Sequence, residues 1–574
     1  MRWHRLYGSA PALALAEALQ RDERLFVIVA PDARELERFA AELRFFAGPH
    51  VPVFPLPDWE VLPYDLFSPH PDIVSDRLRT LHELPDARRG AVLVTAETIL
   101  QRLTPRAYVQ SRSFELAIGE SLALEAFRAR LIESGYANVS QVTGPGEFAQ
   151  RGSLLDVFPM GSDAPLRIDL FDDEIEAIRR FDPDTQRSLD ALERVRLLPA
   201  REIPLDADAV RGFRRRFRTR FEGDPMQTSV YRGVSEGLAP PGIEFYLPLF
   251  HDTTASLFDY LPDDAVIAHD AGLETRLERA FADIEQRYED RRHDLERPVL
   301  APHELFLDPA ETRERLQERA RIAIEPFKAE TETADRDVYN FPTAPPRELR
   351  ADPRAERPLE LLEQFIEAFG GRVLIAADSP GRREVLHEML RAQERSVDLV
   401  PDWESFARGS ARLALTAAPD IEGLTLLEPP VAVVSESQLV GVRARQERRR
   451  KRAASDPEAI LRDLQSLEPG APVVHEEYGV GRYVGLQPME VAGQSGEFLV
   501  LEYLDGDRIY VPVQSLHLVS RYTGAAPESA PLHKLGTDQW PKARKRAAEQ
   551  IRDVAAEMLD LYARRKARTG LKLA

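Results

Sequence analysis

Residues 24–46 read RLFVIVAPDARELERFAAELRFF, an apolar run followed by an amphipathic stretch. The apolar run predicts a buried strand, and the helical spacing of the apolar residues after it predicts a helix. Residues 90–103, GAVLVTAETILQRL, repeat the pattern. Because buried strands that alternate with helices are typical of parallel sheets, the fold class is expected to be α/β.

The chain around these segments is long and acidic. Its 574 residues correspond to roughly four domains of ordinary size. With 76 Lys and Arg against 96 Asp and Glu, the net charge is -20, which argues against a protein that coats nucleic acid by bulk charge. Any contact with nucleic acid is therefore expected to come from local patches.

Several chemistries are excluded by composition. The absence of cysteine excludes disulfides, zinc-thiolate sites and cysteine nucleophiles. The 12 histidines include no HxxxH pair, so a metal site is not expected. No apolar run approaches the roughly 18 residues that span a bilayer, and the start MRWHRLYGSAP lacks the apolar segment of a signal peptide. The cytoplasm is the expected location.

The pattern changes along the rest of the chain. Residues 142–199 contain short strands separated by turn clusters such as GPGEF, which indicates a small strand-rich module. The charged helical stretches of 200–335 indicate that the chain returns to complete the first α/β unit. Residues 330–358 are rich in proline and charge and are interpreted as a linker. A further α/β unit follows, with RVLIAAD and PVAVVSES as strands and SPGRREVLHEML as a helix.

The last part is predicted to be all-β. From Ala471, five short strands with turn glycines predict a small barrel. After Pro541 comes a helical stretch with an apolar stripe that includes Ile551, Met558 and Tyr562. This stripe requires a partner, which is either the barrel, an earlier domain or something beyond Ala574.

A basic segment, GVRARQERRRKRA at 441–453, precedes the barrel. It is either a solvated linker, because like charges repel and keep the chain extended, or an arm that contacts phosphates. The residues that would contact DNA are Arg443, Arg445, Arg448, Arg449, Arg450, Lys451 and Arg452.

No catalytic motif is present. A nucleotide-hydrolysing P-loop requires the motif GxxxxGK[ST] before a helix. At the corresponding position, residues 6–13 read LYGSAPAL and contain one glycine and no lysine. The acidic run Asp172, Asp173 and Glu174 is interpreted as a solvated turn rather than a metal site. These absences favour a binding platform over a catalyst.

A candidate binding surface lies on the predicted strand 166–171, LRIDLF. Alternation places Leu166, Ile168 and Leu170 on one face and Arg167 and Phe171 on the other. If the first face is buried, Arg167 and Phe171 project together into solvent, as at a protein-binding hot spot. The alternative is that a neighbouring loop covers Phe171.

Two separate groups of motifs carry a resemblance to a known family. The strings GEFAQRGSLLDVFPMGSDAPLRIDLFDDEIEAIRRFDPDTQRS and DWEVLPYDLFSPHPDIVSDRL resemble the amino-terminal part of the bacterial transcription-repair coupling factors, Mfd, which shares domains with the excision-repair subunit UvrB. The strings PGAPVVHEEYGVGRYVGL and EYLDGDRIYVPV resemble the CarD-like module with which these factors hold RNA polymerase.

The resemblance implies a domain plan. A UvrB-like, degenerate helicase-type α/β domain without its ATPase site holds an inserted UvrA-binding α+β module. A small α/β domain of unknown role, a basic linker, a Tudor-type or CarD-like barrel and a connector helix follow. The implied ranges are 1–112 and 200–335 for the UvrB-like domain, 113–199 for the insert, 336–440 for the small domain, 441–464 for the linker, 465–532 for the barrel and 533–574 for the connector.

The resemblance also implies sites and partners. By their match to the family motifs, Arg151, Arg167 and Phe171 would bind UvrA, and Met489 would contact the β subunit of RNA polymerase. The family continues into a motor that uses ATP and magnesium and binds double-stranded DNA. The present sequence is therefore expected to be a motorless or amino-terminal piece, with no cofactor of its own and no membrane partner. The aromatics Trp59, Tyr64 and Phe67 are too few for UvrB's damage-probing hairpin.

Three functions follow as expectations. The first is an adaptor in transcription-coupled nucleotide-excision repair, which binds stalled RNA polymerase and recruits UvrA. The second is a UvrB-like ATP-dependent helicase subunit that acts directly on damaged DNA. The third is a CarD-like transcription regulator, which leaves the UvrB-like half of the sequence unexplained.

Overall fold

The computed structural model describes most of the chain up to residue 440 and a smaller part beyond it. The described residues are 1–183, 185–329, 337–351, 358–393, 395–418, 421–440, 470–475, 478–491, 494–512, 519–521, 532 and 534. The chain divides into two compact units, Met1–Arg443 and Ala444–Ala574, and each is described by itself. In the described part, no helix is both long and apolar enough to cross a membrane.

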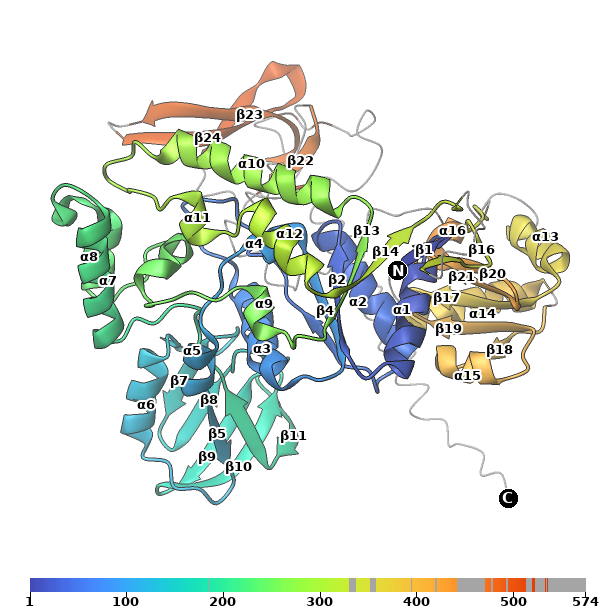
Figure 1. Ribbon diagram of the computed structural model, residues 1–574, viewed down its shortest axis with the longest axis horizontal. Coiled ribbons are helices and arrows are strands. Elements are labelled where there is room, and N and C mark those ends of the chain that lie inside the picture. The colour runs from blue at the N-terminus through green and yellow to red at the C-terminus, as the bar shows by residue number, and fades with distance from the viewer. Residues whose placement is uncertain are drawn as a thin grey trace. The chain divides into compact units, whose positions relative to one another are not determined.

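A parallel sheet organises the first domain (Figure 1). Its seven strands run in the order β15-β1-β14-β13-β2-β4-β3, and every pair is parallel. The strands are β1 (Arg2–His4), β2 (Leu25–Ala30), β3 (Val53–Pro55), β4 (Gly90–Thr95), β13 (Val266–Asp270), β14 (Ala320–Glu325) and β15 (Val338–Asn340). All residues of β2 and β4 are buried, as their apolar runs predict.

Both faces of this sheet are covered by helices. Val27 and Val29 pack into one hydrophobic core, whereas Phe26 and Ile28 pack into another, because successive side chains of a strand point to opposite faces. The Asp32 side chain accepts a hydrogen bond from the Glu35 amide at 2.8 Å and so caps α2. The helices are α1 (Ala10–Arg21), α2 (Ala33–Ala47), α3 (Pro71–Glu83), α4 (Ala96–Leu100), α10 (Leu273–Arg291), α11 (Pro302–Leu305) and α12 (Pro309–Gln317).

The chain leaves the parallel sheet after α4 and returns to it at β13, so the strands on both sides of the inserted module belong to one sheet. The segments on either side of the insert are largely helical. They comprise η1 (Leu84–Asp86), α5 (Arg106–Ser111), α7 (Ala207–Arg220), η2 (Pro225–Gln227), α8 (Ser229–Ser235), η3 (Ile243–Leu249) and α9 (Leu257–Tyr260).

The inserted module is a sheet with one covering helix, α6 (Leu124–Glu133). Six strands run in the order β11-β10-β9-β8-β7-β6, and a separate pair joins β12 to β5. The strands are β5 (Phe114–Ala117), β6 (Ala137–Asn138), β7 (Glu147–Arg151), β8 (Leu154–Val157), β9 (Leu166–Phe171), β10 (Glu174–Phe181), β11 (Ser188–Leu192) and β12 (Arg194–Leu197).

The third α/β unit is a six-stranded sheet in the order β16-β20-β21-β17-β19-β18. Its strands are β16 (Thr343–Ala344), β17 (Arg372–Ala377), β18 (Asp398–Leu399), β19 (Leu413–Ala417), β20 (Leu424–Leu427) and β21 (Pro430–Ser435). Its helices are α13 (Glu360–Phe369), α14 (Pro380–Ala392), α15 (Trp403–Arg408) and α16 (Glu436–Val440). Phe406, Ile421 and Leu424 share a core with Leu13 and Leu43, so this unit packs on α1 and α2.

The linker interpretation of 330–358 is wrong for its central part. Residues 338–340 form β15, which pairs with β1, and residues 343–344 form β16, which pairs with β20. The edge of β1 offers unpaired backbone groups, and a three-residue strand can satisfy them without any apolar periodicity in its sequence.

The second unit contains a five-stranded antiparallel sheet, with strands where the sequence predicts them. The order is β25-β24-β23-β22-β26. The elements are β22 (Pro472–His475), β23 (Gly479–Val491), β24 (Gln494–Glu502), η4 (Leu504–Gly506), β25 (Arg508–Pro512) and β26 (Val519–Arg521). Val473, Leu499 and Leu501 are buried in it. Among the strand pairings of the described residues, none joins β25 to β26 to close a barrel.

Two predicted segments lie outside the described residues. One is the basic segment with Arg443, Arg445, Arg448, Arg449, Arg450, Lys451 and Arg452. The other is the helix expected after Pro541, with its apolar stripe.

Candidate functional site

The six-stranded sheet of the inserted module has one face that is buried in its central strands. Leu166, Ile168 and Leu170 of β9 lie in the main core together with Phe127 and Leu131 of α6, as the alternation predicts. The opposite face, which we call the outer face, carries the other three side chains of β9: Arg167, Asp169 and Phe171.

Strand register places all three predicted UvrA-binding residues on the outer face. Arg151 of β7 is opposite Leu154 of β8, and Leu154 is opposite Asp169 of β9. Directly opposed residues of antiparallel strands point to the same side, so Arg151 shares a face with Arg167 and Phe171. Because a strand rises about 3.3 Å per residue, Phe171 lies at the Arg151 end of the sheet and Arg167 roughly 13 Å along β9.

Phe171 is the exposed member of the site, with 70% of its surface accessible. It ends β9, and it pairs with Glu174 across a two-residue turn made by Asp172 and Asp173. Asp172 adopts a positive φ of 52°, which aspartate tolerates in tight turns. The interpretation of this acidic run as a turn is therefore confirmed. The groups of His, Cys, Asp and Glu in the described residues include none suited to hold a metal ion.

The expectation that Arg167 projects into solvent is wrong. Its side chain is only 16% exposed and forms a bidentate ion pair with buried Asp156, at 2.8 and 2.9 Å. Its guanidinium also lies 4.8 Å from the centre of the Phe181 ring and donates to the Gln186 carbonyl oxygen at 3.2 Å. A small second core around Phe181 covers this end of the outer face. Arg167 is thus held in one orientation, with only an edge exposed.

Arg151 is exposed, and its guanidinium donates to the Ser140 carbonyl oxygen at 2.8 Å. Sequence reasoning missed Asp156 and Phe181, which orient Arg167. The carboxylate stands in the DVFP motif, but only the β8–β9 register, which pairs Asp156 with Arg167, indicates its role. The outer face therefore combines an exposed aromatic with one exposed and one largely enclosed arginine.

The predicted polymerase contact lies in the second unit. Met489 is in β23, opposite Gly496 of β24, two residues before the pair Val491 and Gln494 that ends the strand ladder. The contact is therefore placed near the tip of a long hairpin.

The position of a P-loop is filled by protein. In the tight turn between β1 and α1, the Ser9 hydroxyl accepts hydrogen bonds from the amides of Glu422 and Gly423 at 3.0 and 3.1 Å and donates to Glu42 at 2.5 Å. The Ser9 amide donates to the Gly423 carbonyl oxygen at 2.8 Å. The loop before β20 thus occupies the helix end at which a P-loop protein holds phosphates.

The Glu42 carboxyl at this contact is fully buried, and burial raises its pKa to about 7, despite the opposing effects of Arg38 and Ser9. The folded protein keeps a proton that the unfolded chain loses from about pH 4.5 upward, so this group makes stability fall as pH rises from about 4.5 to about 7. From pH 5 to pH 8, the free energy of unfolding of the wild type is expected to fall by about 2 to 3 kcal/mol more than that of the variant Glu42→Gln.

Urea denaturation at the two pH values measures this difference. The variant Glu17→Gln, which removes an exposed carboxylate of α1, is the control and should follow the wild type. Parallel pH profiles for Glu42→Gln and the wild type would contradict the assignment.

Of the three aromatic residues that are too few for UvrB's damage-probing hairpin, Trp59 and Tyr64 are not available as probes, and Phe67 is half-buried. Trp59 and Tyr64 are buried, and each packs on Phe245, with ring centres 5.6 and 5.9 Å apart. The Trp59 ring nitrogen donates to buried Glu202 at 3.1 Å. These side chains belong to the core of the first domain.

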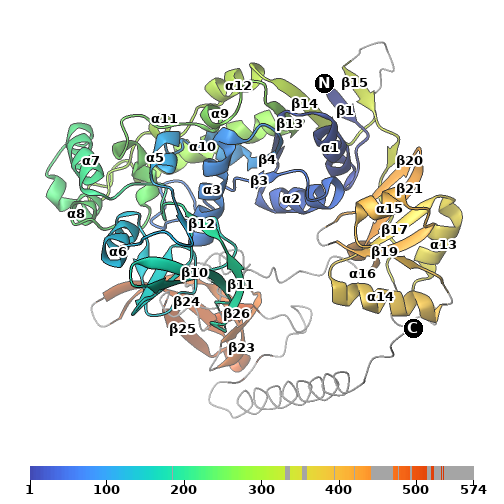
Figure 2. The ribbon, with the colours of Figure 1, turned by 90° about the horizontal axis from the view of Figure 1, so that it is seen from below.

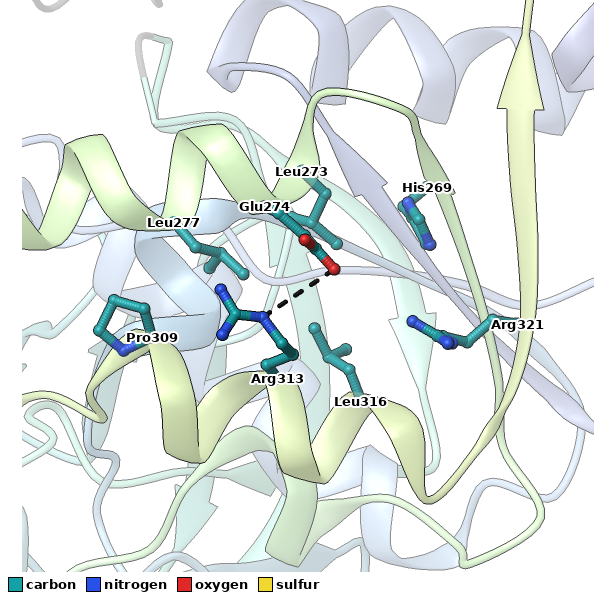
Figure 3. Close-up of a pocket in the computed structure, with 8 residues that line it drawn as sticks. All are labelled: His269, Leu273, Glu274, Leu277, Pro309, Arg313, Leu316 and Arg321. Carbon is teal, nitrogen blue, oxygen red and sulfur yellow. Dashed lines mark ion pairs between the residues drawn. The ribbon is translucent and has the colours of Figure 1, made fainter.

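A pocket lies between α10 and α12, near the ends of β13 and β14 (Figure 3). Leu273, Leu277 and Leu316 line it, and Arg313 lies 4.0 Å from Glu274 across it. Burial lowers the pKa of His269 at its edge. The Glu274 carboxylate is paired with Arg313, and no serine, threonine or cysteine that His269 could activate lines the pocket, so it offers no pair of nucleophile and base.

Three family models match the chain. They are the UvrB interaction domain at residues 114–203, the MFD D3 domain at 365–439 and the CarD-like/TRCF RID domain at 467–523. Fold and site together thus define a multidomain α/β protein with a UvrB-type interaction module and a CarD-like module.

The full-length comparisons identify the relatives. The chain is 41% identical over 575 residues to the transcription-repair-coupling factor of Haemophilus influenzae. This match covers 99% of the chain and 49% of the relative. The chain is 40% identical to that of Escherichia coli and 32% identical to that of Myxococcus xanthus, with 98% and 99% of this chain and 49% of each relative covered. Over nearly its whole length the chain is therefore homologous to transcription-repair-coupling factors, and it spans about half the length of these relatives.

Proposed function

We propose that the chain is an adaptor in transcription-coupled nucleotide-excision repair. In this proposal, the five-stranded unit binds the β subunit of RNA polymerase near Met489, and the outer face of the inserted module binds UvrA. The observation that carries the proposal is the exposed Phe171 on the same face as Arg151 and the fixed Arg167. The matches to the UvrB interaction and CarD-like domains support the two partners.

The three residues have different proposed roles. Phe171 would be the anchor, because exposed aromatics supply most of the energy at hot spots. Arg151 would add a charged contact at the same end. Arg167 would contribute its exposed edge at little entropic cost, since Asp156 and Phe181 already fix it.

Binding of UvrA tests this proposal. The variant Phe171→Ala is expected to lose about 2 kcal/mol of binding free energy, roughly a thirtyfold weaker affinity in calorimetric titration. The matched control is Phe327→Ala, which removes a phenyl ring that is 73% exposed in the first domain. Arg167→Ala is less informative, because it also leaves Asp156 buried without its partner.

Polymerase binding provides the cross-control. The variant Met489→Asp should weaken binding to RNA polymerase and leave UvrA affinity unchanged, whereas Phe171→Ala should do the reverse. Equal UvrA affinities for Phe171→Ala and Phe327→Ala, or no UvrA binding by the unmodified chain, would contradict the proposal.

We also propose that this chain uses no cofactor and hydrolyses no ATP. In this proposal, the family's ATP, magnesium and most of its double-stranded DNA contacts belong to the motor. The loop at Gly423 on the α1 terminus supports this. The helicase alternative has no observation in its favour, since Trp59 and Tyr64 are buried. DNA-stimulated ATP turnover by this chain would overturn the proposal.

We propose the cytoplasm of a bacterial cell as the location. We also propose that the basic segment at Arg443–Arg452 contacts DNA, in addition to the contacts made by the motor.

A further inference from the structure

Helix α7 is strongly basic although the chain is acidic. Within Ala207–Arg220 it carries arginine at positions 211, 214, 215, 216, 218 and 220, against the single acid Asp208. The whole chain has a net charge of -20. A local excess of this size creates a positive potential that the rest of the surface does not share.

The helical period divides these arginines into two groups. Phe213 and Phe217 bury the apolar face of α7 in the core. On one flank of that face, Arg216 pairs with Asp252, and Arg220 pairs with Glu304. The arginines on the opposite side point away from these carboxylates.

We call these side chains the arginine patch. All are exposed, and in the described part of the chain no ion pair involves any of them. The arginine patch consists of Arg214, Arg215 and Arg218 of α7 and Arg232 of α8.

Tyr231 of α8 holds part of the arginine patch in place. Its hydroxyl accepts a hydrogen bond from Arg214 Nε at 3.3 Å, and the Arg218 guanidinium lies 5.5 Å from its ring centre. The ring itself packs against Phe217 at 5.2 Å, and α7 and α8 lie side by side in both views of the molecule (Figures 1 and 2). Guanidiniums held on a rigid aromatic lose little freedom when they bind a ligand.

We infer that the arginine patch binds the phosphate backbone of duplex DNA without reading sequence. Guanidinium groups match phosphate oxygens bidentately. Arg214, Arg215 and Arg218 lie within about one turn of α7, and Arg232 lies on the neighbouring helix α8, so the four groups form one compact patch. Within the described residues, no carboxylate pairs with the arginines of the patch, so we expect their ligand to carry several negative charges. This contact adds a DNA-binding surface to the adaptor proposed above and does not depend on that proposal.

Other polyanionic partners fit less well. A membrane-binding helix inserts its apolar face into lipid, but Phe213 and Phe217 are buried in the protein core. Single-stranded nucleic acid stacks its bases on exposed aromatics, but Phe213, Phe217 and Tyr231 of the two helices are all buried. The backbone of a duplex requires neither feature.

Fluorescence anisotropy with a short labelled duplex of random sequence, at several salt concentrations, tests the inference. The test variant is the triple substitution Arg215→Gln, Arg218→Gln, Arg232→Gln, which leaves Arg214 on Tyr231. The control is Arg194→Gln, Arg279→Gln, Arg391→Gln, which removes three exposed arginines that form no ion pair within the described residues. Equal melting temperatures for the two triple variants will show that both remain folded.

The test variant is expected to lose at least about tenfold in affinity at low salt, and the slope of log K against log salt should fall by roughly 2 to 3. The control should keep both values. Equal losses in the two variants, no loss in either, or no duplex binding by the unmodified chain would overturn the inference. Unchanged duplex binding with weaker UvrA or polymerase binding would also overturn it and assign the arginine patch to a protein. The duplex assay contains neither protein, so its failure would not count against the adaptor function.

Discussion

Replacing Arg77 by methionine is expected to lower the free energy of unfolding of the first domain by about 3 to 5 kcal/mol, because it leaves a buried carboxylate without its counter-ion. Arg77 is fully buried, and it donates from Nε and Nη2 to the two oxygens of Glu202, at 2.5 and 3.2 Å. Its third donor reaches the Pro57 carbonyl oxygen at 2.6 Å. Trp59 donates to the same carboxylate.

This cluster connects the neighbouring segments at Trp59 and Arg77 to Glu202, which lies 125 positions after Arg77. Arg77 is in α3, Trp59 precedes that helix, and Glu202 follows the last strand of the inserted module. The buried ion pair therefore fixes where the module rejoins the domain. Its loss should also disturb the geometry of the outer face.

Urea denaturation of the wild type and the variant measures the loss. Arg21→Met is the matched control, because Arg21 is 81% exposed and its pair with Glu17 should contribute at most about 1 kcal/mol. The double variant Arg77→Met, Glu202→Leu removes the unpaired charge and should recover part of the stability. A loss below about 1 kcal/mol in Arg77→Met would show that water reaches Glu202 and that the pair is not essential.

The sequence predicts most of the architecture, because the strands of the parallel sheets are continuous apolar runs. LFVIVA has no polar position and GAVLVT has one only at its last residue, Thr95, so only a strand covered on both faces can bury them. The alternation in LRIDLF likewise predicts which side of β9 is buried. Periodicity is a local property, and these elements depend on it alone.

The environment of Arg167 could not be predicted in the same way. Whether its face is open depends on the opposed Asp156 and on Phe181, which comes from the end of the next strand. A one-residue change in the β8–β9 register would move Asp156 to the other face, and one in the β9–β10 register would move Phe181. The sequence alone does not determine that register. Phe171 stays exposed because it ends its strand beside a turn.

The contact between α1 and the third α/β unit is the second feature that local patterns do not predict. Gly8 and Gly423 lie more than 400 positions apart, and neither is in a recognisable motif. Gly8 has a positive φ of 55°, and a side chain there would collide with the Gly423 carbonyl oxygen and with Pro346. The close approach allows Ser9 to bond both neighbouring amides of the loop.

Replacing Gly8 by alanine is therefore expected to cost about 3 kcal/mol or more, from the strained backbone and from the steric conflict together. Since the conflict is with backbone rather than with a flexible side chain, the loop at Glu422 and Gly423 must withdraw from α1. Hydrogen exchange should then accelerate at these two amides, because their acceptor is the Ser9 hydroxyl. Denaturation and exchange mass spectrometry measure the two effects.

Gly370→Ala separates strain from collision. Gly370 ends α13 with a φ of 68°, and no atom lies within 4 Å of the position that a Cβ would occupy. This variant should cost only about 1 kcal/mol and leave the exchange of Glu422 and Gly423 unchanged. If Gly8→Ala behaved like Gly370→Ala, the third unit would not be tightly docked on α1. The amino-terminal end of α1, where a P-loop protein holds phosphates, would then be open. The structural argument against nucleotide binding by this chain would no longer hold.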